Sequence, residues 1–204
     1  MKNVMRQWPV LPLALLLTAL ATPNASAQVQ LKGGISHGDL TTTTPTVAPG
    51  KLNGRTGFAL GLAYQDHPSG SHIGFGTELL YSQRGGTSTK TGFDRRIDYV
   101  DFPVYLTVSS TSNSKAVAPY AYLGPQASFE VRCKTGLGDC PQDGRQSTVF
   151  EGVVGVGLHF RRERDLSIEA RYVRGFNDLG IGTADGQGAY DQSALMLMVG
   201  VGIH

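Results

Sequence analysis

Residues 150–160 read Phe-Glu-Gly-Val-Val-Gly-Val-Gly-Leu-His-Phe, and this stretch decides the fold. Large apolar side chains alternate in it with glycine and polar residues, which is the two-residue period of a β-strand with one apolar face. Phe150 and Phe160 fall on the same face, about 33 Å apart along a strand at 3.3 Å per residue. In a strand tilted by ~40° this distance projects to roughly 25 Å, the height of the apolar band of a transmembrane β-barrel. The stretch therefore predicts a strand that crosses an outer membrane.

The same alternation recurs along the chain and predicts eight strands, at 28–36, 56–64, 73–81, 97–109, 117–131, 150–160, 166–172 and 195–203. Short connections alternate with long ones, and the long ones are 37–55, 85–96, 132–146 and 177–192. All long connections then fall at one end of an up-and-down meander. Bacterial outer-membrane barrels have an even number of strands, with short periplasmic turns and longer external loops. The sequence therefore predicts an all-β, eight-stranded antiparallel up-and-down transmembrane β-barrel.

Residues 1–27 have the features of a secretory signal peptide. Lys2 and Arg6 precede an apolar stretch, and Ala25-Ser26-Ala27 ends the segment with small residues. We expect cleavage after Ala27, which leaves residues 28–204 as one outer-membrane barrel domain. The alternative is a short anchor helix that stays attached, and the short apolar stretch argues against it.

Without this segment the chain is formally neutral, which excludes several classes of protein. The 204 residues include 18 Lys and Arg against 16 Asp and Glu. Lys2 and Arg6 account for the whole difference. A neutral balance excludes a strongly basic nucleic-acid-binding protein and an acidic disordered tail. No apolar run approaches the ~20 residues of a transmembrane helix, and all 27 glycines lie after the signal peptide.

The polar faces of the predicted strands indicate where the apolar faces point. They combine many glycines with few charged residues, whereas a face in water would carry Lys, Glu, Thr and Gln in place of repeated glycine. Inside a narrow eight-stranded barrel, glycine makes room and the charges pair with one another. We therefore predict an interior polar network of Lys32, Glu78, Asp101, Glu130, Glu169 and Arg171. Against the lipid we predict an aromatic girdle that includes Phe58, Tyr64, Phe150 and Phe160.

Four short motifs resemble a known barrel family. They are ELLYSQRG at 78–85, DYVDFPV at 98–104, PYAYLGP at 119–125 and EARY at 169–172. They are similar to strand segments of the PorT-like outer-membrane β-barrel family of Bacteroidetes-type bacteria, over most of the chain. The resemblance implies a barrel with a role in the outer envelope, and a few relatives assist protein secretion or gliding. The expected partners are outer-membrane lipids and, during biogenesis, the barrel-assembly machinery, although Ile203-His204 stands where an aromatic ending is typical.

Two cysteines fall in one of the predicted long connections. Cys133 and Cys140 enclose the residues Lys-Thr-Gly-Leu-Gly-Asp. In an exported protein such a pair predicts a disulfide that fastens the connection. A metal or redox pair is the weaker alternative, because the spacing is not Cys-x-x-Cys and no histidine is close in the sequence.

The remaining residues with catalytic chemistry form no recognisable set. The histidines lack the spacing of a zinc site, and the glycines of 152–157 lead to no helix that could hold a phosphate. Carboxylates on the polar faces are better explained as partners of Lys32 and Arg171 than as a hydrolytic pair. We therefore expect a non-enzymatic barrel without cofactor, metal or nucleic-acid partner.

Its lumen should be filled by side chains, and its long external loops should mediate surface contact, envelope organisation or an accessory role in secretion. Two alternatives stay open. One is a barrel enzyme that acts on outer-membrane lipid, which needs Ser and His together near the outer rim, and the sequence indicates no such pair. The other is a soluble periplasmic barrel that binds an apolar ligand, as lipocalins do.

Overall fold

The computed structural model describes residues 27–42, 53–66, 71–88, 93–110, 117–136, 138–140, 147–161, 165–176 and 190–203. The predicted signal peptide, except Ala27, lies outside the described residues. None of the described residues belongs to a helix that is long and apolar enough to cross a membrane.

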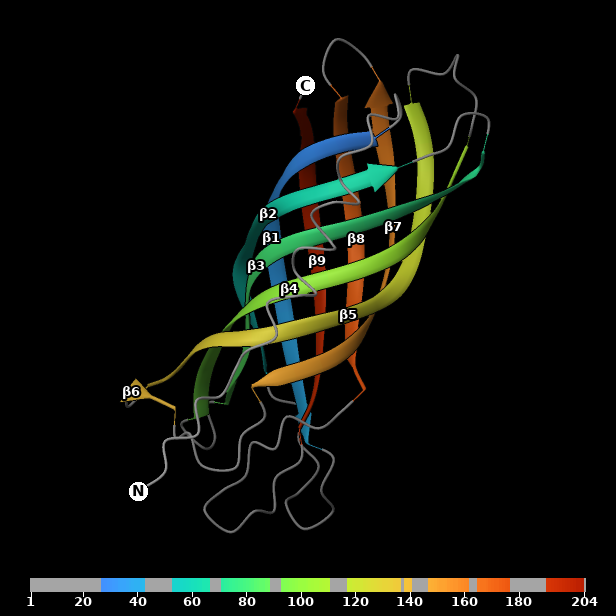
Figure 1. Ribbon diagram of the computed structural model, residues 1–204. Helices are drawn as coiled ribbons and strands as arrows, with labels where there is room; N and C mark the ends of the chain where they lie inside the picture. Colours follow the sequence, from blue (N-terminus) through green and yellow to red (C-terminus); the bar gives the residue numbers. More distant parts are fainter. Residues whose placement is uncertain are drawn as a thin grey trace, which may run out of the picture.

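The described residues form eight long strands and one two-residue strand: β1 (Ala27–Thr42), β2 (Asn53–Asp66), β3 (Ile73–Ser88), β4 (Phe93–Ser109), β5 (Val117–Thr135), β6 (Gly138–Asp139), β7 (Thr148–Arg161), β8 (Asp165–Gly175) and β9 (Tyr190–Ile203). Each long strand pairs antiparallel with the next one along the chain, and β6 only extends β5. The first and last strands also pair, from Val29 opposite Ile203 to Thr42 opposite Tyr190. The sheet is therefore closed (Figure 1), and the predicted eight-stranded antiparallel barrel is confirmed.

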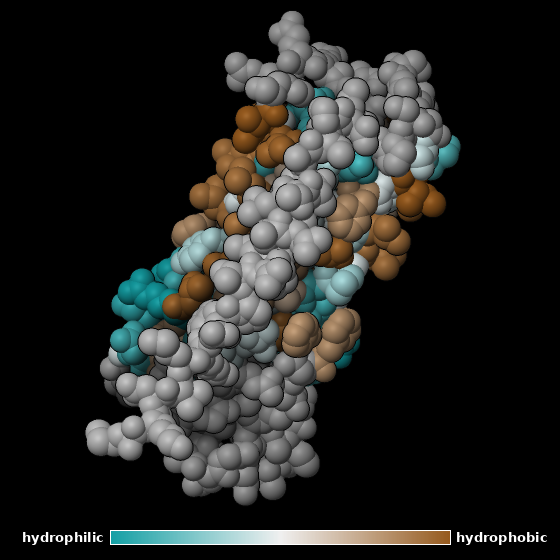
Figure 2. Space-filling view, in the orientation of Figure 1, coloured by the Kyte–Doolittle hydropathy of each residue, from teal (hydrophilic) through white to brown (hydrophobic). Residues whose placement is uncertain are grey.

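The outer wall is apolar and the interior is polar. On the outside, large side chains such as Val156 (59% exposed) and Leu195 (52% exposed) face away from the barrel. Figure 2 shows brown hydrophobic side chains over the wall, with teal polar ones gathered at its lower left. Inside, charged residues such as Lys32 and Arg171 are almost fully buried. A protein that folds in water has the opposite arrangement, so the wall argues for lipid and against the lipocalin-like alternative.

The strand bounds predicted from the sequence agree with the structure better at one end of the barrel than at the other. At the short-turn end, where β2 meets β3, β4 meets β5 and β7 meets β8, predicted and observed strand bounds nearly coincide. At the opposite, long-loop end the strands run farther than predicted. β1 continues to Thr42 instead of residue 36, and β3 to Ser88 instead of residue 81. The apolar alternation stops where the wall leaves the lipid, but the hydrogen-bonded ladder continues.

One predicted connection is wrong for this reason. The sequence predicted a long loop at 85–96, whereas β3 and β4 pair as far as Ser88 opposite Phe93, which leaves only 89–92 between them. This connection is shorter than 110–116, which belongs to the short-turn end. The regular alternation of long and short connections is therefore broken here, while 43–52 and 176–189 still separate strands at the long-loop end.

Candidate functional site

The lumen contains a neutral charged cluster nearer the short-turn end, which we call the Lys32 cluster: Lys32, Glu78, Glu169 and Arg171. Lys32 Nζ lies 2.7 Å from Glu78 Oε1 and 2.8 Å from Glu169 Oε2. Arg171 Nη2 lies 2.7 Å from Glu78 Oε2 and also contacts Glu169. Because these residues come from β1, β3 and β8, the ion pairs join opposite walls of the barrel. Each carboxylate contacts both cations, so the buried charges balance.

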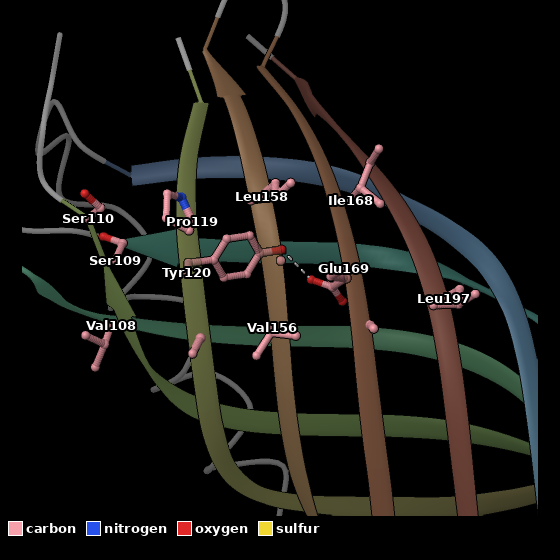
Figure 3. Close-up of a pocket in the computed structure, with 13 residues that line it drawn as sticks. Val108, Ser109, Ser110, Pro119, Tyr120, Val156, Leu158, Ile168, Glu169 and Leu197 are labelled. Carbon is pink, nitrogen blue, oxygen red and sulfur yellow. Dashed lines mark hydrogen bonds between the residues drawn. The ribbon is translucent and has the colours of Figure 1, made fainter. Parts of the chain in front are cut away.

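Three tyrosines surround this cluster and donate hydrogen bonds to its carboxylates. Tyr105 donates its hydroxyl to Glu78 at 2.7 Å, and Tyr120 donates to Glu169 at 2.8 Å. Tyr122 donates to Glu169 at 3.1 Å. Figure 3 shows the ring of Tyr120 reaching from β5 toward Glu169 on β8. Glycine makes room for these rings, since a Cβ at Gly155 would lie 2.3 Å from Cζ of Tyr122.

A second cluster lies nearer the long-loop end, and we call it the Arg84 cluster: Arg84, Asp101 and Glu151. Arg84 Nη1 donates to both oxygens of Glu151 at 2.7 and 2.9 Å, and Nη2 donates to Asp101 Oδ2 at 2.6 Å. All three side chains are at most 1% exposed. One cation therefore serves two buried carboxylates, so this cluster carries one net negative charge.

Asp101 and Glu151 share one cation, and neutral hydrogen-bond donors contact both carboxylates as well. Ser82 donates to Asp101 Oδ2 at 2.6 Å, while Gln126 donates to Glu151 Oε2 at 2.7 Å and Ser128 donates to the same oxygen. The guanidinium of Arg84 also lies over the ring of Tyr99, with its Cζ 5.2 Å from the ring centroid. These contacts hold the carboxylates in place.

Apolar side chains separate the two clusters and close the lumen above them. Val153, Val173 and Ala194 lie in register on three neighbouring strands between the clusters, and all are buried. At the long-loop end a second apolar group fills the lumen, formed by Leu40, Ile97, Tyr99, Cys133, Cys140 and Val149. Cys133 and Cys140 form a disulfide in the structure. The disulfide therefore belongs to a small apolar core in the mouth of the barrel.

Five of the six predicted network residues lie in these clusters: Lys32, Glu78, Asp101, Glu169 and Arg171. Glu130 points inward from β5 as well, but it is half-buried near the long-loop end and lies outside both clusters. The prediction missed Arg84 and, as a network member, Glu151. The alternation of Glu78, Leu80, Ser82 and Arg84 on the inner face could have revealed Arg84 if the strand had been extended beyond residue 81.

The four predicted girdle residues all lie on the outer side of the wall. Phe58 and Phe150, 49% and 60% exposed, lie toward the long-loop end of β2 and β7. Tyr64 and Phe160 lie toward the short-turn end of the same strands. Their placement at two levels fits the predicted girdle, whose role in contacting lipid headgroups stays a prediction.

A hydroxyl, an imidazole and a carboxylate meet on the outer side near the long-loop end, which the sequence did not predict. His37 Nδ1 lies 3.0 Å from Thr56 Oγ1, and His37 Nε2 lies 4.0 Å from Asp39 Oδ1. His37 and Thr56 are cross-strand partners on β1 and β2. His37 and Asp39 share one face of β1 because they are two residues apart, but only the register brings Thr56 to them, so the sequence could not have indicated the whole group.

A shallow groove of about 710 Å³ lies on the wall toward the short-turn end. Figure 3 shows its lining, in which outward side chains such as Val156, Leu158 and Ile168 contribute most of the surface. The lining also includes the small residues Ala121, Gly157 and Ala170. This groove therefore belongs to the lipid-facing wall.

Comparison with known proteins agrees with this architecture. Neisserial surface protein A (NspA) is 15% identical, with 87% of this chain and 99% of NspA covered and a TM-score of 0.51. The attachment invasion locus protein Ail of Yersinia pestis is 15% identical over 87% of this chain and 99% of Ail, with a TM-score of 0.47. OprG of Pseudomonas aeruginosa is 12% identical over 88% and 97%, with a TM-score of 0.48. At this identity the likeness to NspA shows the fold alone.

The family assignment comes from the sequence. A comparison with curated proteins finds no match, and no comparison names the PorT-like family, so that narrower resemblance stays a prediction. Residues 21–180 match the model of the family described as outer membrane protein beta-barrel domain. The chain therefore belongs to the outer membrane protein beta-barrel domain family and is a protein of the bacterial outer membrane.

Proposed function

We propose that this protein is a non-enzymatic outer-membrane barrel with a closed lumen. It acts through its long external loops in surface contact, in envelope organisation or as an accessory to secretion. The observation that carries the proposal is the filling of the lumen by the Lys32 and Arg84 clusters. Their charged groups contact one another from opposite walls, so the interior serves to hold the barrel together and the ends are left for contacts with partners.

The charges inside support a structural role over transport. A porin lumen is lined by charges that face water, whereas Lys32, Glu78 and Arg171 are 0% exposed and make ion pairs at 2.7–2.9 Å. Moving a solute through would require several of these buried pairs to separate, and each separation leaves an uncompensated charge at a cost of about 3–5 kcal/mol.

Liposomes that contain the refolded protein should therefore exclude small sugars. We expect swelling in arabinose at the rate of protein-free liposomes, with a general porin as the positive control. A heat-modifiability gel on the same preparation verifies that the barrel is folded. Sugar entry that rises with the amount of folded barrel would contradict the closed lumen.

The His37 group favours a second candidate, a hydrolase that acts on ester-linked membrane lipid. The contact of 3.0 Å between His37 and Thr56 is within reach for a base and a nucleophile. The separation of 4.0 Å between His37 and Asp39 leaves the ring without a firm orienting partner. The non-enzymatic proposal is preferred for this reason.

A matched pair of variants separates the two candidates. Wild-type protein in mixed micelles with an ester-linked phospholipid should release no fatty acid above the level of Thr56→Ala or His37→Ala, as measured by mass spectrometry. Release by wild type that falls to background in both variants, while the barrel stays folded, would instead establish the hydrolase.

A further inference from the structure

A small polar pocket on the outer side near the long-loop end has the composition of an anion site. It has a volume of about 120 Å³ and is lined by Arg55, Thr56, Gly57, Gln83, Arg84 and Arg96. The side chains of Arg55, Thr56, Gln83 and Arg96 all carry hydrogen-bond donors, and two of them are guanidinium groups. The guanidinium of Arg84 is bound to Asp101 and Glu151 in the lumen. We propose that this pocket binds the phosphate group of a membrane-lipid headgroup.

The backbone of β2 and β3 builds the pocket. Their ladder is interrupted between Gly54 and Ala59, so Arg55 and Thr56 pair with β1 but not with β3. β3 continues there with Gly85 and Gly86, which carry no side chain. A Cβ at Gly85 would lie 2.0 Å from the carbonyl oxygen of Arg95, so this position must stay bare. Arg55 of β2 can therefore reach across β3 and form an ion pair with Asp94 of β4.

The pocket opens on the outer side of the barrel. Arg96 lies opposite Lys134 in the ladder, and Asp98 lies opposite Arg132. The residues between them, Ile97 and Cys133, are buried in the mouth of the barrel. Because side chains alternate along a strand, Arg96, Asp98, Arg132 and Lys134 point outward.

The level of these residues matches the lipid headgroups. Val131, 56% exposed, is the last large apolar residue of β5 before the long-loop end. Arg132 and Lys134 follow it by about 3 and 8 Å along the barrel axis, at 3.3 Å per residue and a tilt of ~40°. The polar layer of a bilayer is roughly 5–8 Å deep on each side. A phosphate in that layer is thus at the height of the pocket.

Basic and acidic side chains are equal in number around the pocket, and Asp39 beside Gly54 is one of the acidic ones. The basic side chains are Arg55, Arg96, Arg132 and Lys134, and the acidic ones are Asp39, Asp94, Asp98 and Asp139. Arg55 and Asp94 are 34% and 48% exposed, and exposed pairs are weak, so Arg55 can exchange Asp94 for a stronger anion.

The side chain of Arg96 is held more firmly than that of Arg55. Its Nε and Nη2 donate to the nearly buried Asp98 at 2.9 and 3.3 Å, which holds the guanidinium plane at the pocket. A phosphate monoester carries a charge of about −1.5 to −2 and three acceptor oxygens. The forked donors of arginine fit such a group in a bidentate manner.

Native mass spectrometry of the folded protein from detergent micelles tests the proposal with two lipids. Phosphatidic acid and diacylglycerol differ only in the phosphate. We expect wild type to retain phosphatidic acid and not diacylglycerol. Arg55→Gln with Arg96→Gln should weaken retention by about tenfold or more, because charge-assisted hydrogen bonds are lost. The exposed pair Arg132→Gln with Lys134→Gln should weaken it less, and this variant leaves Gly85 and Gly86 unchanged.

Arg174→Gln is the matched control, since Arg174 is another exposed arginine at the long-loop end of β8, 3.9 Å from Asp191. It should retain phosphatidic acid as wild type does. Equal retention by wild type and the double variant of Arg55 and Arg96 would overturn the proposal, as would an equal loss in Arg174→Gln. A third arm uses inorganic phosphate. If it binds without lipid and displaces phosphatidic acid at equal concentration, the site takes free phosphate and the lipid assignment fails.

Discussion

Replacing Arg84 with methionine is expected to destabilise the barrel by about 3–5 kcal/mol, because the two buried carboxylates of its cluster would lose the cation that contacts both of them. Arg84 donates to Asp101 and to both oxygens of Glu151, and no other described cation shows a contact with either carboxylate. Methionine fills a similar volume, so the loss measures charge and hydrogen bonds more than packing. Equilibrium urea unfolding in detergent, followed by circular dichroism, measures the change.

Asp101→Asn provides the matched control in the same cluster. Asp101 Oδ2 accepts from Ser82 and Arg84, whereas Oδ1 is buried without a hydrogen-bond partner. An asparagine oxygen can keep the first two bonds, and the substitution removes the net negative charge of the cluster. We expect stability within ~1 kcal/mol of wild type. If Arg84→Met unfolds at the urea concentration of wild type, or Asp101→Asn loses as much as Arg84→Met, the described charge balance is wrong.

The part of each strand inside the membrane could be predicted because lipid imposes a pattern on it. Between Phe150 and Phe160 the outward positions must be apolar, so the alternation marks the strand directly. Beyond the lipid the outward positions are polar and inward positions include apolar residues such as Leu40, so the pattern disappears although the ladder continues. For this reason β1 could not be followed from residue 36 to Thr42, nor β3 from residue 81 to Ser88.

The sequence allowed us to predict that charged residues fill the interior, but not which residues contact one another. A charge on a strand face next to glycines indicates burial, which identified Lys32 and Glu169. The sequence does not state which residues face each other across a closed barrel, because this depends on the stagger of all the strands. Arg84 was missed because it lies in the part of β3 that carries no lipid pattern.

The features of the outer rim depend even more on register. His37 meets Thr56 because Ile35 is paired with Phe58 farther along the same two strands. The arginine pocket exists because the β2–β3 ladder is interrupted between Gly54 and Ala59. Neither the pairing nor the interruption has a local sequence signal, so both sites needed the structure.

Removing Lys32 should also destabilise the barrel by about 3–5 kcal/mol, and removing one of its partners at the same time should restore most of that loss. Lys32→Met leaves Glu78 and Glu169 with Arg171 as the only cation, so one buried negative charge is uncompensated. Adding Glu78→Gln neutralises this charge. The glutamine oxygen can still accept from Tyr105 and Arg171.

Glu78→Gln alone completes a double-mutant cycle, because it leaves two cations with Glu169 and should also be destabilising. We expect the double variant to be more stable than the sum of the single effects allows, with a coupling of about 1–3 kcal/mol. Urea unfolding of the four proteins under one detergent condition gives the cycle. Additive losses would show that Lys32 and Glu78 do not act as a pair. A double variant less stable than either single variant would show that the side chains stabilise the barrel through packing and not through compensation of charge.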